Sequence, residues 1–200
     1  MINPALHALR GAFQAYAARE APDIAAFCGA ELERDHGERA LEPRSLPMTA
    51  HLPDLRDRAA PATAPLLEAV LAAAPHLHWR QSYTEADPGF DADYLARYGW
   101  FNLIAPSGPF VSGALRLSVG YWGKGLHYPD HHHAPEEIYL TIAGEGRYIS
   151  EGRADVTGGP GTTICHRSGQ RHAATMETAP LLAAAFWRGE GLEAKSVLES

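Results

Sequence analysis

The sequence predicts a mainly β protein with an α-helical N-terminal half. Two observations lead to this fold class. The first hundred residues are rich in alanine and carry apolar residues at helical spacing, whereas from about residue 101 short apolar alternations are separated by glycines. Short strands of this kind are typical of an antiparallel sandwich or barrel. We therefore expect a helical region over residues 1–100, packed on a β-barrel over residues 101–200 as one folding unit.

The first half predicts three helices. Asn3 and Pro4 form an N-cap followed by proline at the first helical position. Leu6, Leu9, Phe13 and Tyr16 then form one apolar stripe. A second helix is expected near Asp23 to Arg34, and a third over "APLLEAVLAAAPHL", which should stop at Pro75. Residues 35–65 are expected to be loop with a short helix at most, and "DADYLARYGWFNLI" fits either a helix or a strand.

The second half predicts strands. In "GALRLSVGYW" the residues Leu115, Leu117, Val119 and Tyr121 alternate with other residues, so they share one face of a strand. "EEIYLTIAGEGRYISEG" indicates a strand, a glycine turn and another strand. "GTTICHRSGQRHAATM" and the apolar run "PLLAAAFWRGEG" follow. No internal repeat is visible.

Composition limits the kinds of partner. The formal net charge is −7, which disfavours binding to nucleic acid or to an anionic membrane. No run approaches the roughly 18 apolar residues of a membrane helix, and the N-terminus has no secretory signature. We therefore expect a small-molecule ligand. Monomer and homodimer both remain open.

Two cysteines, Cys28 and Cys165, lie far apart in sequence in apolar surroundings, and neither belongs to a CxxC pair. Such cysteines are typically reduced thiols. They fit a cytoplasmic protein.

The segment "HYPDHHHAPEEIY" contains the strongest chemical signal. His131, His133, Glu137 and Tyr139 all have odd numbers, so an extended chain would point them to one side. Imidazole and carboxylate together suit Zn, Fe, Mn, Co or Ni. A further ligand must come from another strand: His172 is the first candidate and His166 the second. His132 has the opposite parity and is expected to face solvent or to support the ligands.

These residues match a known motif. Gly125, His131, His133, Glu137 and Gly144 fit the first cupin motif at every position. The second cupin motif is matched in part, at Gly161, Gly169 and His172, whereas Arg167 and Met176 replace its proline and asparagine. The chain thus resembles the cupins over about residues 115–187. The resemblance implies a double-stranded β-helix (jelly-roll) barrel that holds one divalent transition metal ion in its mouth.

A narrower resemblance is to the cupin-type dimethylsulfoniopropionate (DMSP) lyases. That family has a tyrosine three residues before the first motif histidine, here Tyr128, and another two residues after the glutamate, here Tyr139. It also has a late tryptophan near its pocket, for which Trp187 is the match. The resemblance implies the cleavage of DMSP to dimethyl sulfide and acrylate by β-elimination. Ordinary cupins do not require the two tyrosines.

In this interpretation the metal activates the substrate carboxylate and a tyrosine removes the α-proton. Tyr139 and Tyr128 are equal candidates for that base. Trp187, Tyr121 or Tyr128 could hold the sulfonium group by cation–π attraction, and His127 is a further pocket candidate.

Two other classes of function compete with the lyase. One is another metal-dependent cupin enzyme, such as a dioxygenase or an isomerase acting on a small carboxylate. A three-histidine thiol dioxygenase is disfavoured by Glu137. The other is a non-catalytic binding cupin, against which the intact set of four ligands counts.

Overall fold

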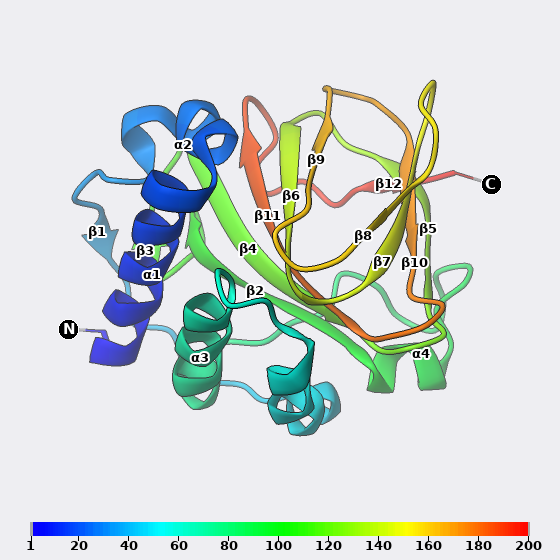
Figure 1. Cartoon of the computed structure of the whole chain (residues 1–200), viewed down its shortest axis with the longest axis horizontal. Helices are drawn as coiled ribbons and strands as arrows, with labels where there is room; N and C mark the ends of the chain where they lie inside the picture. The colour runs from blue at the N-terminus through cyan, green and yellow to red at the C-terminus, as the bar shows by residue number, and fades with distance from the viewer. Residues whose placement is uncertain (1, 200) are drawn as a thin grey trace.

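Helices cover one face of a large sheet, and a second sheet lies across its other face (Figure 1). A computed structural model describes residues 2–199. The helical elements are α1 (Pro4–Glu20), α2 (Pro22–Cys28), α3 (Ala64–Ala73) and α4 (Ala92–Ala96), with 3-10 turns η1 (Gly29–Glu31), η2 (Pro47–Arg58) and η3 (Ala74–His76). None of the helices in this part of the chain is long and apolar enough to cross a membrane.

The seven-stranded sheet has the order β1-β3-β2-β4-β11-β6-β9. Its strands are β1 (Gly37–Glu38), β3 (Phe110–Val111), β2 (Tyr98–Ala105), β4 (Leu115–Trp122), β11 (Leu181–Arg188), β6 (Glu136–Gly144) and β9 (Thr163–His166). The five-stranded sheet has the order β12-β5-β10-β7-β8. Its strands are β12 (Val197–Leu198), β5 (His127–His132), β10 (His172–Thr175), β7 (Gly146–Ser150) and β8 (Val156–Gly158). This is the expected double-stranded β-helix with N-terminal helices.

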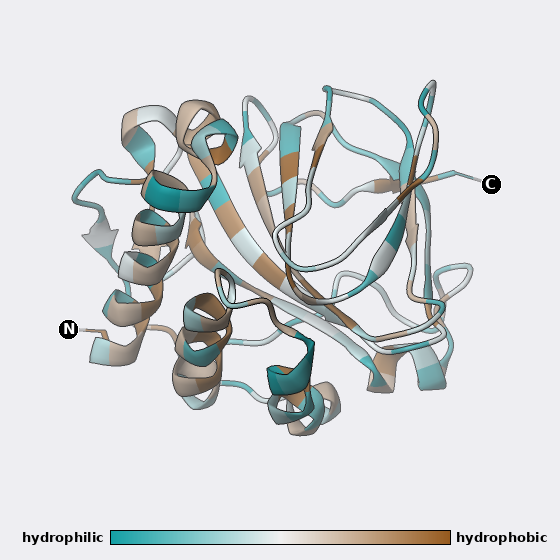
Figure 2. Ribbon diagram, in the orientation of Figure 1, coloured by the Kyte–Doolittle hydropathy of each residue, from teal (hydrophilic) through white to brown (hydrophobic). Residues whose placement is uncertain are grey.

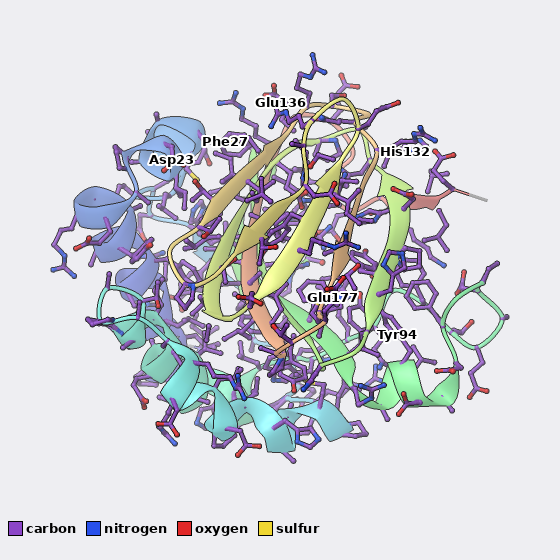
Figure 3. The ribbon with its side chains drawn as sticks, turned by 45° about the vertical axis from the view of Figure 1, so that its right-hand side comes forward. Asp23, Phe27, Tyr94, His132, Glu136 and Glu177 are labelled. Atoms are coloured by element: carbon purple, nitrogen blue, oxygen red, sulfur yellow. The ribbon has the colours of Figure 1, made fainter. Side chains whose placement is uncertain are left out.

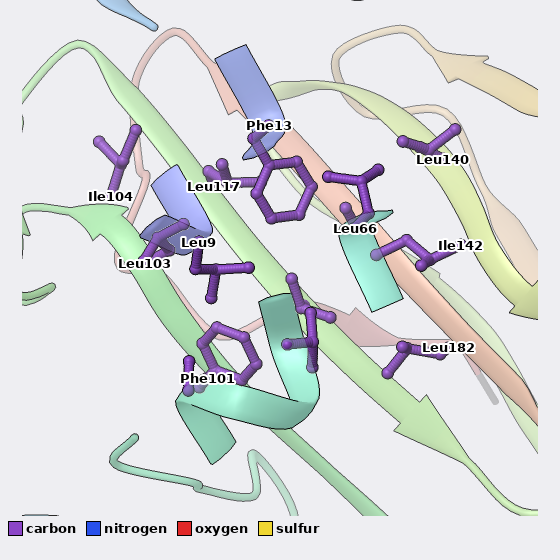
Figure 4. Packing of buried hydrophobic residues seen from close by; sticks show 14 of the residues in the cluster. Leu9, Phe13, Leu66, Phe101, Leu103, Ile104, Leu117, Leu140, Ile142 and Leu182 are labelled. Carbon is purple, nitrogen blue, oxygen red and sulfur yellow. The ribbon is translucent and has the colours of Figure 1, made fainter. Parts of the chain in front are cut away.

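The first helix forms as predicted. The side chain of Asn3 accepts a hydrogen bond from the backbone N–H of Ala5, and the residues of the apolar stripe are buried. Figure 4 shows Leu9 and Phe13 of α1 and Leu66 of α3 facing Phe101, Leu117, Leu140 and Leu182 of the sheet. The helical half and the barrel thus share one core.

Two local predictions need correction, and one open alternative is resolved. The second helix ends at Cys28 instead of Arg34, because Gly29 adopts a positive φ of 55° that an α-helix does not accommodate. The segment 35–65 is more ordered than expected, with a twelve-residue 3-10 helix at Pro47–Arg58. The segment "DADYLARYGWFNLI", which fitted either a helix or a strand, forms first the helix α4 and then the strand β2.

Alternate residues of the central strands face two different environments. On β4 the apolar residues at 115, 117, 119 and 121 pack in the core under the helices, while Arg116, Ser118, Gly120 and Trp122 face the space between the two sheets. The banding of apolar and polar residues along the strands is visible in Figure 2. The same alternation on β6 and β11 brings Glu137, Tyr139 and Trp187 into that space.

Candidate active site

Three histidines and one glutamate meet inside the barrel. His131 lies on β5 opposite His172 of β10, His133 follows the end of β5, and Glu137 lies on β6. All four side chains are buried. The ring nitrogens of the three histidines lie within 4.8 Å of one another. Oε2 of Glu137 lies 3.4 Å from Nε2 of His133 and 3.3 Å from Nε2 of His172. The structure thus brings the four predicted ligands together.

Backbone carbonyls orient each of these histidines. Nδ1 of His131 donates to the carbonyl of Pro129 at 2.8 Å, Nδ1 of His133 to that of Pro135 at 2.9 Å, and Nδ1 of His172 to that of Gln170 at 2.9 Å. A carbonyl only accepts, so Nδ1 carries the proton and Nε2 keeps its lone pair. This is the arrangement found in metal-binding histidines.

Two of these inward nitrogens lack a conventional partner. Within residues 2–199, Nε2 of His133 and Nε2 of His172 are buried and make no hydrogen bond. Burial, with the neighbouring His172, lowers the pKa of His131 to about 3, so that ring is neutral at pH 7. Buried nitrogens without a partner are costly, and a bound cation would satisfy them. The donor set therefore fits a divalent transition metal ion.

Glu137 supplies the negative charge of the cluster. Burial opposes its ionisation, but the neighbouring imidazoles of His133, His166 and His172 hold its pKa well below the ordinary value. Its Oε1 accepts a hydrogen bond from Nε1 of Trp187 at 2.5 Å. Glu137 is thus a fixed carboxylate.

His166, the second candidate for the fourth ligand, takes a different place. Its Nδ1 lies 2.9 Å from Oε2 of Glu137, and its Nε2 lies 3.0 Å from the hydroxyl of Ser150. Both ring nitrogens therefore have partners within the protein. His166 also belongs to a second compact group, with Glu137 and His172, whose ligand atoms lie within 4.8 Å of one another.

A cavity of about 250 Å³ adjoins the cluster, and Glu137, Tyr128, Tyr139 and Trp187 line it. Small residues at alternate positions of β4 and β11 line the cavity, namely Ser118, Gly120, Ala183 and Ala185. Larger side chains at these positions would fill the space. The cavity therefore exists because the sequence has small residues between its bulky ones.

Both predicted tyrosines reach the cavity. The ring of Tyr128 lies 4.3 Å from that of His131, and its hydroxyl lies 3.2 Å from the hydroxyl of Tyr83. The ring of Tyr139 lies 6.4 Å from that of His172. Burial raises the pKa of both tyrosines well above the ordinary value, and the charge of Glu137 adds to the shift at Tyr139. Neither phenol ionises readily without a positive charge nearby.

Two predicted pocket residues lie elsewhere. Tyr121 has the opposite parity to the cavity residues of β4 and packs in the core under the helices, so it does not line the cavity. His127 is exposed, with Nδ1 at 2.9 Å from the hydroxyl of Thr175, and it is also absent from the cavity wall. His132 points away from His131 and His133, and its Nδ1 lies 2.7 Å from Oε1 of Glu199. Figure 3 shows it at the outside of the molecule.

Four residues that were not proposed as site residues also line the cavity. Trp122 and Tyr98 lie beside Tyr128, with ring centroids 5.6 and 6.2 Å from it. Arg116 and Trp100 line the same space. Tyr98 and Trp100 lie on β2, and Arg116 and Trp122 lie on β4. In the sequence, only the alternation along β4 indicated such a role, because Arg116 and Trp122 share the face opposite its apolar residues.

The sequence matches the DMSP lyase family model over residues 24–183. This chain belongs to the DMSP lyase family. It is 36% identical over 196 residues to the dimethylsulfoniopropionate lyase DddQ of Ruegeria pomeroyi, which covers 98% of this chain and 94% of that protein. The family is one of carbon–sulfur lyases, so the expected class of enzyme is confirmed.

Solved structures agree with this assignment. A chain from the crystal structures of the DMSP lyases RdDddP and RnDddQII is 36% identical, with a TM-score of 0.89 and 98% of both chains covered. The crystal structure of DddQ from Ruegeria pomeroyi is 35% identical, with a TM-score of 0.88 and 98% and 96% of the two chains covered. A cupin-2 domain from Rhodospirillum rubrum, 16% identical with a TM-score of 0.50, covers 63% of this chain and 77% of its own, and shows the fold alone.

Proposed function

We propose that this protein cleaves DMSP to dimethyl sulfide and acrylate, and that a tyrosine begins the reaction by removing a proton. The observation that carries the proposal is the meeting of two phenols, Tyr128 and Tyr139, with the cluster of histidines and Glu137 at one cavity. The relative from Ruegeria pomeroyi is named for the same substrate. A dioxygenase or isomerase has no comparable support.

The ligands of the proposed metal are His131, His133, Glu137 and His172. A divalent ion of Zn, Fe, Mn, Co or Ni bound there would supply Lewis acidity towards the substrate carboxylate, which makes the α-proton easier to remove. The protein's own part is to hold the carboxylate of Glu137 and the histidine lone pairs in place.

The base takes the α-proton at its phenolate oxygen. The electron pair of the C–H bond forms the carbon–carbon double bond, and the bond to sulfur breaks with its electrons on neutral dimethyl sulfide. Tyr139 is the first candidate, because the hydroxyl of Tyr128 is already hydrogen-bonded to Tyr83, whereas no such bond within residues 2–199 involves the hydroxyl of Tyr139. A neighbouring cation favours the phenolate form.

The aromatic end of the cavity suits the sulfonium group. Trp122, Tyr98 and Tyr128 have ring centroids 5.6 to 6.2 Å apart, and all three line the cavity. Aromatic faces attract cations by their quadrupole. Trp187 lies at the other end, hydrogen-bonded to Glu137, where it packs against His133 at 4.1 Å between centroids.

The decisive experiment is a headspace assay. Metal-replete protein given DMSP is expected to release dimethyl sulfide and an equal amount of acrylate, and a chelator should abolish both. If the metal-replete protein released no dimethyl sulfide, the proposed function would be wrong.

A further inference from the structure

Arg116 is a buried cation on the cavity side of β4. Its side chain is 9% exposed, and it lines the cavity together with Glu137 and Trp187. Arginine is almost never this buried unless it is paired. Neither the metal site nor the tyrosine step uses it, so its position needs a reason.

The contacts of Arg116 fix its guanidinium plane. Nε donates to Oδ1 of Asn102 and Nη1 to the carbonyl of Leu192, each at 3.1 Å. Its central carbon lies 4.7 Å from the ring centroid of Trp100 and 4.3 Å from that of Trp187. The two indoles cover its faces, so further donors are available only at its edge. Within the described residues, the hydrogen bonds of Arg116 use Nε and Nη1 and none uses Nη2.

No carboxylate neutralises this cation directly, since none of the ion pairs among residues 2–199 includes Arg116. Glu193, the acidic residue with the largest electrostatic effect on Arg116, instead accepts hydrogen bonds from the backbone N–H and the hydroxyl of Ser107. Burial lowers the pKa of Arg116, and Glu193 and Glu137 raise it in part. An arginine stays protonated in proteins, so a full positive charge faces the cavity.

The strand register gives the cavity two different ends. Trp187 of β11 pairs with Arg116 on one side and with Glu137 on the other, so the three form one row across the sheet. Two strand steps place Arg116 and Glu137 roughly 10 Å apart at their Cα atoms. Trp122 lies three cavity-facing positions further along β4 from Arg116, at the aromatic end.

We propose that Arg116 selects the direction in which the zwitterionic substrate enters, by binding its carboxylate at the Nη2 edge and repelling its sulfonium group. This inference rests on the proposed function for its substrate. The sulfonium is thereby directed towards Tyr98 and Trp122, and the carboxylate towards the row formed by Arg116, Trp187 and Glu137. Charge-assisted hydrogen bonds of arginine to carboxylate are among the strong ones.

The test separates the two ends of the ligand. Propionate carries the carboxylate alone and trimethylsulfonium the cation alone, and their binding to metal-replete protein is measured by titration calorimetry. In Arg116→Met, propionate should bind about tenfold or more weakly, as expected from losing a charged hydrogen bond. Trimethylsulfonium should bind as well as before or better. Arg188→Met is the matched control, because Arg188 follows Trp187 on β11 but pairs with the exposed Glu136 on the outside.

Two further variants keep the test valid if Arg116→Met does not fold. Arg116→Gln removes the charge and retains an amide donor for Asn102. It should weaken the binding of propionate and leave the binding of trimethylsulfonium unchanged. Arg116→Lys retains the charge and should bind propionate more tightly than Arg116→Gln. Unchanged propionate affinity in the neutral variants, or an equal loss for both probes, would overturn the proposal. Calorimetry needs no turnover, so failure of the headspace assay would not be mistaken for failure of this inference.

Discussion

Nδ1 of His166 on β9 donates a hydrogen bond of 2.9 Å to Oε2 of Glu137 on the neighbouring strand β6. Glu137 only accepts, so the neutral ring of His166 presents Nε2 as an acceptor to the hydroxyl of Ser150. Burial lowers the pKa of His166, which keeps this neutral form. The sequence offers His166 as the second candidate for a ligand, and we infer from these two contacts that it positions Glu137 instead.

The first prediction concerns this contact. His166→Ala should weaken metal binding about 10- to 100-fold, because a carboxylate ligand loses the partner that orients it. His133→Ala, which removes a proposed ligand itself, should weaken it further. Metal content after dialysis against graded chelator measures both. Equal retention of metal by His166→Ala and the unchanged protein would contradict this role.

The second prediction separates the tyrosines. Tyr139→Phe should lower kcat by at least about a hundredfold if its phenolate is the base, with metal content unchanged. Tyr128→Phe should act mainly through KM, because its ring faces the cation end and its hydroxyl is bonded to Tyr83. Tyr121→Phe is the control, since Tyr121 packs on the other face of β4. Full turnover in both cavity variants would exclude a tyrosine base.

The third prediction compares two glycines of the first cupin motif. Gly144 has a φ of +79°, and a Cβ there would lie 1.7 Å from the carbonyl oxygen of Pro180. Gly125 has a φ of +83° with open space around it. Gly125→Ala should cost about 1–2 kcal/mol from backbone strain alone, and Gly144→Ala should cost more, since the backbone must also move. Chemical denaturation of both variants measures the difference, and equal losses would refute it.

The fourth prediction concerns the thiols. Burial raises the pKa of Cys28 to about 12, and the side chain is only 6% exposed. Its thiolate is scarce at pH 8, so iodoacetamide should label the exposed Cys165 and leave Cys28 unmodified until the protein unfolds. Mass spectrometry of the labelled peptides identifies the site. Early labelling of Cys28 would show that its burial is incomplete in solution.

The fifth prediction tests the small residues that line the cavity. Ala185→Leu should fill space beside Tyr139 and raise KM for DMSP several-fold or more, while metal content stays the same. Ala184→Val is the comparison on the opposite face, where the change should lower stability through the core instead. Steady-state kinetics with a thermal melt of each variant distinguishes the two effects. An unchanged KM in Ala185→Leu would show that the substrate does not reach this part of the cavity.

The meeting of the proposed metal ligands could be predicted in part from the sequence, because three of them follow local spacing. His131, His133 and Glu137 lie within seven residues, and strand parity with a known motif is enough to group them. His166 and His172 lie close together in sequence and both end beside Glu137, so spacing could not assign their roles. Their hydrogen-bond partners, Ser150 and the carbonyl of Gln170, became visible only in the folded chain.

The cavity itself could not be predicted in the same way. Alternation on β4 separated Tyr121 from Trp122, but apolar residues on one face normally mean that the other face meets water. Here the second face is covered by the other sheet, so polar and small residues line a cavity. Arg116 was missed for this reason, and Tyr121, proposed as a pocket residue, lies on the core face of β4.

The division of each central strand between helices and cavity has an evolutionary consequence. Substitutions at the even positions of β4, such as Ser118, alter the cavity while the odd positions keep the contacts with α1 and α3. A lineage could therefore exchange one substrate for another through a few replacements on one face. The contacts that fold the chain would remain largely unaffected, so new chemistry and structural integrity can be selected independently.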